Sequence, residues 1–191
     1  MIKHILIAAM LACIAGAGPA AAVTLGDDGL HKAPWLHETF KDLRDDLAEA
    51  STAGQRLAVI IEQRGCIYCT KMHEEVFVLP EIQKMLSEDY FVVQINMFGD
   101  VDVTDFDGTT LSEKDMVRRW NVLFTPTVMF MPEEVAPDVS AMQAAVAVMP
   151  GAFGKFTTFN MLNWVKDHGY DSDESFQKYH ARKIAEGGFP E

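Results

Sequence analysis

The chain has 191 residues, of which 49% are apolar and 23% are charged, and its formal net charge at pH 7 is −12. This apolar fraction excludes an intrinsically disordered chain, and the charged fraction excludes a polytopic membrane protein. The excess of acidic residues excludes a nucleic-acid-binding domain, which needs a basic surface. Since one domain commonly holds about 100–200 residues, we expect a single globular domain.

Residues 1–22 have the composition of a secretory signal peptide. A short basic start precedes an apolar run over residues 5–15, and Ala20–Ala22 offer the small side chains that signal peptidase accepts. A membrane anchor needs roughly 20 uninterrupted apolar residues, and this run is shorter. We predict export and cleavage, which leave a mature domain over residues 23–191 that is not embedded in the membrane. A lipoprotein modified at Cys13 is the alternative, and the residues before Cys13 resemble a lipobox poorly.

Helical and strand patterns alternate along the mature chain. Residues 34–53 place apolar side chains at helical spacing behind Pro34, which suits a first turn, and so predict an N-terminal helix. The β-branched run Leu57–Gln63 predicts a buried central strand. The later patterns predict, in order, helices over 70–76 and 80–87, a strand over 90–97, a helix over 112–120, strands over 127–131 and 144–149, and a helix over 155–167.

An acidic insertion and a polar tail complete the chain. Residues 99–115 contain six acidic residues and one lysine, and we expect a polar, solvated loop there. A calcium-binding EF-hand loop beginning at Asp100 is excluded, because it would place Asp105 where glycine is needed and Leu111 where glutamate is needed. Residues 171–191 form a polar tail with room for one short helix. The element order predicts an α/β domain with a mixed sheet.

Two of the three cysteines, Cys66 and Cys69, are the candidate reactive residues. Cys13 leaves with the signal peptide, so Cys66 and Cys69 remain as one close pair. A disulfide between them closes a minimal loop and stabilises the fold little, which favours reactivity or metal binding as its role. We expect Cys66 at the N-terminus of a helix, where backbone N–H groups favour the thiolate that attacks disulfides. Cys69, one turn later, is expected to resolve the mixed disulfide.

Metal binding is the alternative use of these two thiols. Structural zinc sites have four Cys or His ligands. His73 could serve as a third ligand beside Cys66 and Cys69, and no fourth is evident in the sequence. Copper binding through methionine side chains is a second version of this alternative. We therefore expect no metal and no other cofactor, and we keep a Zn or Cu module as the competing hypothesis.

Taken together, these residues resemble the thioredoxin superfamily. The resemblance spans about residues 55–168 and rests on the strand at 57–62, the Cys66–Cys69 motif, Thr125-Pro126-Thr127 before a strand, and Pro150-Gly151-Ala152 before the last core helix. It implies a three-layer fold with a mixed sheet, extended by the N-terminal helix and by the acidic insertion before the proline. It also implies that Pro126 is cis, and that Thr125, Pro126, Ile67 and Tyr68 contact the substrate.

The sequence departs from the usual thioredoxin pattern near the cysteines. Arg64-Gly65 stands where a tryptophan commonly precedes the first cysteine, and Ile60 stands where thioredoxins keep a buried aspartate. Glu62 lies two residues later on the same strand face. We predict that Glu62 substitutes as a proton acceptor for Cys69. An exposed strand end without a catalytic role is the alternative for Glu62.

A narrower resemblance is to the periplasmic thioredoxins of bacterial sulfur-oxidation (Sox) systems. It rests on the signal segment, the sequence EQRGCIYC, the insertion ending in FDG, the TPT segment and the tail. It implies a periplasmic reductase that acts on the reactive cysteine of a sulfur-carrier complex and is recharged by a membrane electron donor of the CcdA/DsbD type. We also expect a monomer. The uncharged Ile67-Tyr68 dipeptide also favours a reductase, and a thiol oxidase or isomerase stays the alternative.

Overall fold

The computed structural model describes residues 24–190. The predicted signal peptide lies outside the described residues and stays a prediction. Within the described part of the chain, no helix combines the length and the apolar character that a membrane crossing requires.

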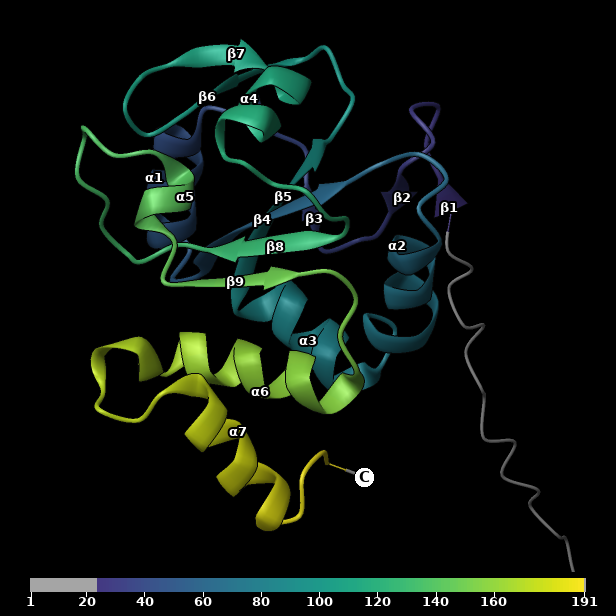
Figure 1. Cartoon of the computed structure of the whole chain (residues 1–191), viewed down its shortest axis with the longest axis vertical. Coiled ribbons are helices and arrows are strands. Elements are labelled where there is room, and N and C mark those ends of the chain that lie inside the picture. Colours follow the sequence, from purple (N-terminus) through teal and green to yellow (C-terminus); the bar gives the residue numbers. More distant parts are fainter. Residues whose placement is uncertain (1–23, 191) are drawn as a thin grey trace, which may run out of the picture.

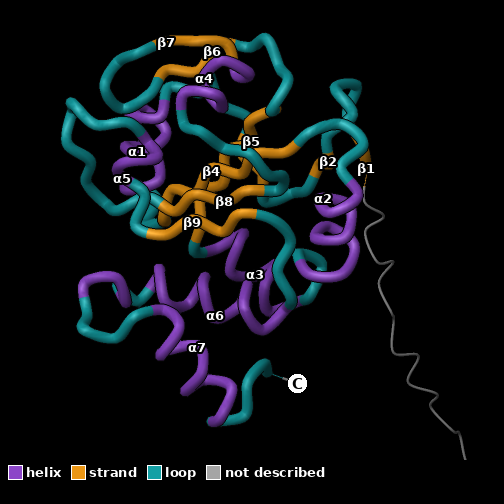
Figure 2. The backbone as a smooth tube through the Cα atoms, in the orientation of Figure 1, coloured by secondary structure: helices purple, strands orange, loops and turns teal. Residues whose placement is uncertain are grey.

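A five-stranded mixed sheet forms the centre of the fold, in the strand order β3-β5-β4-β8-β9 (Figures 1 and 2). The strands are β3 (Leu36–His37), β4 (Arg56–Glu62), β5 (Tyr90–Asn96), β8 (Thr127–Phe130) and β9 (Ala147–Pro150). β3, β5 and β4 run parallel, whereas β8 and β9 pair antiparallel to their neighbours. The predicted mixed α/β architecture is confirmed.

Helices cover both faces of this sheet and make three layers (Figure 1). Strand side chains alternate between faces, so Ala58 and Ile60 of β4 enter one apolar core, while Val59 and Ile61 enter the other. This burial on both faces explains why the strand reads as a continuous apolar run. The helices are α1 (Leu43–Thr52), α2 (Ile67–Lys71), the π-helical turn η1 (Met72–Val76), α3 (Pro80–Glu88), α4 (Glu113–Arg119), α5 (Ala141–Ala144), α6 (Lys155–Lys166), the 3-10 turn η2 (Gly169–Asp171) and α7 (Phe176–Ala185).

Small sheets and the tail surround these layers. β1 (Thr24–Leu25) pairs with β2 (His31–Lys32), and β6 (Asp102–Thr104) pairs with β7 (Thr110–Ser112). The short helix expected in the tail is present as α7, which packs on α6 away from the sheet (Figure 1). The strands predicted over 57–63, 90–97 and 127–131 are confirmed as β4, β5 and β8, whereas the strand predicted over 144–149 begins later because residues 141–144 form α5.

The helix predicted over residues 34–53 is wrong in its first half. Leu36 and His37 instead form the edge strand β3, and helix α1 begins only at Leu43, where the Asp42 side chain accepts a hydrogen bond from the backbone N of Arg44 at 3.1 Å. Phe40, expected on the apolar helix face, is 98% exposed. The helical spacing is coincidental, because backbone pairing with β5 decides the conformation of this segment.

The acidic insertion is solvated only in part, because Asp100 and Asp102 are exposed whereas other acids are buried. Asp105 is fully buried, and its carboxylate accepts hydrogen bonds from Trp120 Nε1 at 2.8 Å and from the backbone N of Ala141 at 2.7 Å, besides pairing with Arg119. A buried carboxylate is tolerated when its oxygens are paired in this way. Asp105 therefore attaches the insertion to the ends of α4 and α5 by hydrogen bonds.

Candidate functional site

Cys66 and Cys69 form a disulfide at the start of α2, with their Cα atoms 5.2 Å apart. Gly65 has a φ of 71°, a left-handed conformation that glycine adopts easily, and it turns the chain from β4 into the helix. Cys66 is the N-cap residue, and its Sγ accepts a hydrogen bond from the backbone N of Cys69 at 3.0 Å. Helix formation thus delivers an N–H donor to the first sulfur.

The loop before β8, which holds Thr125 and Pro126, lies next to this disulfide although it is distant in sequence. The peptide bond between Thr125 and Pro126 is cis. The Thr125 hydroxyl donates to Cys66 Sγ at 3.3 Å, although the two residues are 59 positions apart. The carbonyl of Pro126 accepts a hydrogen bond from the backbone N of Gly151 at 2.7 Å, which fixes the loop to the end of β9. The structure therefore brings together Cys66, Cys69, Thr125 and Pro126.

A groove of about 910 Å³ opens at the disulfide, and Cys66, Ile67, Tyr68 and Thr125 lie in its wall. Ile67 is 73% exposed and Tyr68 is 58% exposed, and Phe124 adds a further exposed ring to the lining of the groove. Exposed apolar side chains gathered around a reactive bond are typical of an interaction surface. The groove can therefore receive an apolar segment of a partner with its sulfur near Cys66.

Glu62, at the end of β4, is fully buried, so the alternative of an exposed strand end is wrong. Its carboxylate accepts hydrogen bonds from Gln94 Nε2 at 2.6 Å and pairs with His73 Nε2 at 3.1 Å. Its role as proton acceptor for Cys69 stays a prediction.

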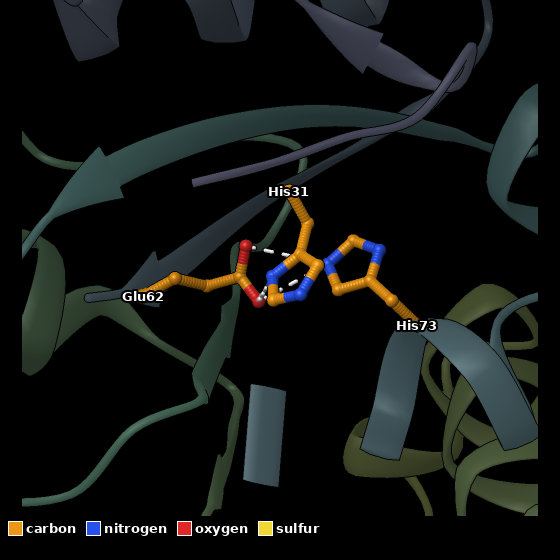
Figure 3. Close-up of side chains that lie close together, drawn as sticks. All are labelled: His31, Glu62 and His73. Atoms are coloured by element: carbon orange, nitrogen blue, oxygen red, sulfur yellow. Dashed lines mark hydrogen bonds and ion pairs between the residues drawn. The ribbon is translucent and has the colours of Figure 1, made fainter. Parts of the chain in front are cut away.

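Two histidines accompany Glu62 (Figure 3). His31 comes from β2 and His73 from η1, and their rings stack with centroids 4.5 Å apart. Burial lowers the pKa of His31, and the neighbouring His73 lowers it further, while Glu62 opposes this shift. The sequence suggests His73 only as a partner of the two thiols, and it does not reveal His31, because no local pattern connects that residue to Glu62.

Comparisons with known proteins agree with this geometry. The family described as Thioredoxin-like domain matches residues 43–137, a range that contains Glu62, both cysteines and Thr125-Pro126. The thiol:disulfide interchange protein DsbD of Colwellia psychrerythraea is 27% identical over 100 residues, which are 49% of this chain. The match spans only 15% of the length of that relative.

Solved structures show similarity at the level of the fold. A thioredoxin-fold protein from Helicobacter pylori superposes with a TM-score of 0.54 at 15% identity, covering 70% of this chain and 87% of the other. A thioredoxin from Thermus thermophilus gives a TM-score of 0.49 at 19% identity, covering 65% and 83% of the two chains.

Proposed function

We propose that this protein, whose residues 43–137 match the family described as Thioredoxin-like domain, is a thiol-disulfide oxidoreductase whose Cys66–Cys69 pair cycles between disulfide and dithiol. The observation that carries the proposal is the disulfide at the start of α2, which faces Thr125 and opens into an apolar groove. The name of the Colwellia relative, a thiol:disulfide interchange protein, describes the same class of reaction.

The exchange follows from the contacts of Cys66. In the reduced protein, the N–H of Cys69 and the hydroxyl of Thr125 are placed to donate to Cys66 Sγ, and both favour a thiolate. The Cys66 thiolate attacks one sulfur of a partner disulfide, and the other partner sulfur leaves as a thiolate that takes a proton. Cys69 then attacks Cys66 Sγ, which reforms the Cys66–Cys69 disulfide and releases the partner as a dithiol. The partner gains two electrons and this protein loses two.

Substrate contact is assigned to residues at the groove. Ile67 and Tyr68 offer exposed apolar surface next to Cys66, and Thr125 lines the groove and contacts Cys66 Sγ, while Pro126 is buried directly behind it. Proline has no backbone N–H, so an extended partner segment can approach the loop there without displacing an internal hydrogen bond. These four residues are expected to determine how tightly a partner docks, whereas the cysteines determine whether it reacts.

The finer proposal is a periplasmic reductase. The resemblance to periplasmic thioredoxins of sulfur-oxidation systems and the predicted signal peptide support this location, and the uncharged Ile67-Tyr68 dipeptide supports the reducing direction. The proposed substrate is the reactive cysteine of a sulfur-carrier complex, held as a disulfide, and a membrane donor of the CcdA/DsbD type returns the electrons. Glu62 is proposed to take the proton of Cys69 when Cys69 attacks.

Trapping tests the reaction and identifies the partner. A Cys69→Ser variant cannot resolve the mixed disulfide, so it should retain its partner through Cys66, and mass spectrometry then names the partner. The matched control is Cys66→Ser, which lacks the nucleophile and should trap nothing. Equal yields from both variants would contradict the assignment of Cys66 as nucleophile.

The redox potential tests the direction. Known members of this superfamily range from about −270 mV for reductants to about −120 mV for strong oxidants. Equilibration of the purified protein with glutathione buffers of known ratio should give a value near the reducing end. A value near the oxidising end would contradict the reductase proposal and leave the oxidoreductase class intact.

A further inference from the structure

His31, Glu62 and His73 form a buried cluster in which the two histidines have no part in the proposed disulfide exchange (Figure 3). They come from three separate segments, the strand β2, the end of β4 and the turn η1, and they are 4%, 0% and 3% exposed. Each offers one ligand atom of the kind that metals bind, and these atoms all lie within 4.8 Å of one another. The fold therefore places two imidazoles and one carboxylate together away from water.

The hydrogen bonds of His31 leave one ring nitrogen without a partner. Its Nε2 lies 3.1 Å from the Thr70 hydroxyl, which in turn donates to the carbonyl of Cys66 at 3.2 Å. Because a carbonyl can only accept, Thr70 uses its proton there and accepts the N–H of His31 Nε2. Nδ1 of the neutral ring then carries a lone pair.

This lone pair faces another acceptor. His31 Nδ1 has no hydrogen-bond partner among the described residues, and it lies 4.0 Å from Oε1 of Glu62. Two acceptors that face each other inside a protein lack the positive group that would satisfy both. A cation between them would satisfy this arrangement.

The surrounding residues hold the three side chains in position. Gln94 Nε2 donates to Oε2 of Glu62 at 2.6 Å and to the carbonyl of His31 at 2.9 Å, which leaves Oε1 directed toward the histidines. Trp35 stacks on the ring of His73, and Phe77 packs against that ring edge-on. Metal ligands are commonly oriented by a second layer of hydrogen bonds of this kind, and a dry apolar wall strengthens the attraction of cation and carboxylate.

We propose that His31 Nδ1, His73 Nε2 and Glu62 Oε1 form a binding site for one divalent zinc-type metal ion. Two imidazoles and one carboxylate are a donor set that Zn²⁺ accepts. Around a tetrahedral ion, metal–ligand bonds of about 2.1 Å place two donors about 3.4 Å apart. Glu62 Oε1 lies 3.1 Å from His73 Nε2 and 4.0 Å from His31 Nδ1, so binding needs only a small inward movement of His31. His73 binds through Nε2 once its ring proton has moved to Nδ1.

This site is distinct from a thiol site. Neither cysteine is a ligand, so the metal binds in the oxidised and in the reduced protein alike. The three ligands leave one position of a tetrahedral ion for water or another small ligand. Because β2, β4 and η1 each contribute one ligand, the metal cross-links the N-terminal segment to the helix that follows Cys66.

Metal counting tests the site directly. The purified protein is stripped with a chelator, kept reduced, equilibrated with Zn²⁺ or Co²⁺, and analysed for metal after dialysis. We expect one Zn²⁺ per chain in the wild type and in a Cys66→Ser/Cys69→Ser variant, with a raised thermal midpoint in both. The Co²⁺ form should lack the charge-transfer absorption of thiolate ligands.

Matched histidine variants locate the binding atoms. His31→Gln should weaken Zn²⁺ binding at least about tenfold, and so should Thr70→Val, because outer hydrogen-bond partners commonly change metal affinity 10- to 100-fold. The control His180→Gln removes a half-buried imidazole on α7 and should bind as the wild type does.

Two results would overturn the proposal. One is a wild-type protein that binds no Zn²⁺ and shows no thermal shift with it. The other is binding that disappears in the double cysteine variant, which would assign the metal to the thiols. Both results come from chains with an intact cluster, so they decide the matter whether or not His31→Gln folds.

Discussion

Replacing Asp105 by alanine should destabilise the whole domain, because this carboxylate joins the acidic insertion to two helices. The substitution removes the acceptor of Trp120 Nε1, held at 2.8 Å, and of the backbone N of Ala141, held at 2.7 Å. Each buried donor left without a partner costs about 1–3 kcal/mol. Arg119 is 30% exposed, so its lost ion pair adds at most about 1 kcal/mol. We expect a loss of about 4 kcal/mol.

This loss is a large part of the total stability of a small domain, which is about 5–15 kcal/mol. Urea unfolding followed by tryptophan fluorescence measures it, and the slope against urea should match that of the wild type, since the same surface is exposed on unfolding. The matched control is Asp102→Ala, which changes an exposed acid of the same insertion and should stay within about 0.5 kcal/mol of the wild type.

The reasoning would be refuted if Asp105→Ala also stayed within about 0.5 kcal/mol, because that magnitude is typical of solvated surface positions. It would also be refuted if, in the wild-type protein, the insertion melted in a separate transition before the sheet. That outcome would show that the hydrogen bonds of Asp105 do not couple the insertion to the core.

Three further predictions concern a pH effect, the nucleophile and the groove. Burial raises the pKa of Asp46 to about 6. Between about pH 4 and pH 6, the folded protein therefore keeps the Asp46 carboxyl protonated, whereas the unfolded chain has lost that proton. The stability that the bound proton provides is lost as the pH rises through 6. Urea unfolding should therefore show Asp46→Asn to be more stable than the wild type by about 1–2 kcal/mol at pH 7.5, after allowance for solvent screening. At pH 4.5 the two proteins should be nearly equal in stability. An equal gain at both pH values would contradict the raised pKa of Asp46. Thr125→Val removes a hydroxyl donor worth about 1 kcal/mol, so reduced Cys66 should react about fivefold more slowly with iodoacetamide at pH 6. An unchanged rate would show that the Thr125 hydroxyl does not stabilise the Cys66 thiolate in the reduced protein. Phe124→Ala should lower kcat/KM about fivefold for a protein disulfide and leave a small-molecule disulfide unaffected; equal losses for both substrates would mean that the ring supports the disulfide itself rather than docking.

The parts of the fold that the sequence predicts well are those dictated by local composition. Leu57–Gln63 is largely apolar because both faces of β4 are buried, and its short length and β-branched residues favour a strand over a buried helix. Cys66 and Cys69 are one helical turn apart, so their pairing follows from the turn itself. In these cases, the physical cause lies within a few residues of its effect.

The parts that escape prediction depend on distant residues. Residues 36–37 satisfy a helical pattern, but their backbone groups bond to β5, more than 50 positions later. The insertion looks solvated because nothing in its sequence shows that Trp120 and Ala141 will meet Asp105. His31 lies 31 positions before Glu62, so neither spacing nor periodicity connects them.

The position of β3 has a consequence for the order in which the domain is completed. Leu36 pairs with Val92 and His37 with Val93, in a parallel arrangement. A chain synthesised from its amino terminus must therefore keep this segment unpaired until β5 has emerged, and contacts over such sequence distances form slowly. Until β3 pairs with it, β5 presents an open sheet edge of the kind that recruits foreign strands. β3 can cover that edge only after residues 90–96 have been made, whereas β8 and β9, on the other side of the sheet, are made later still.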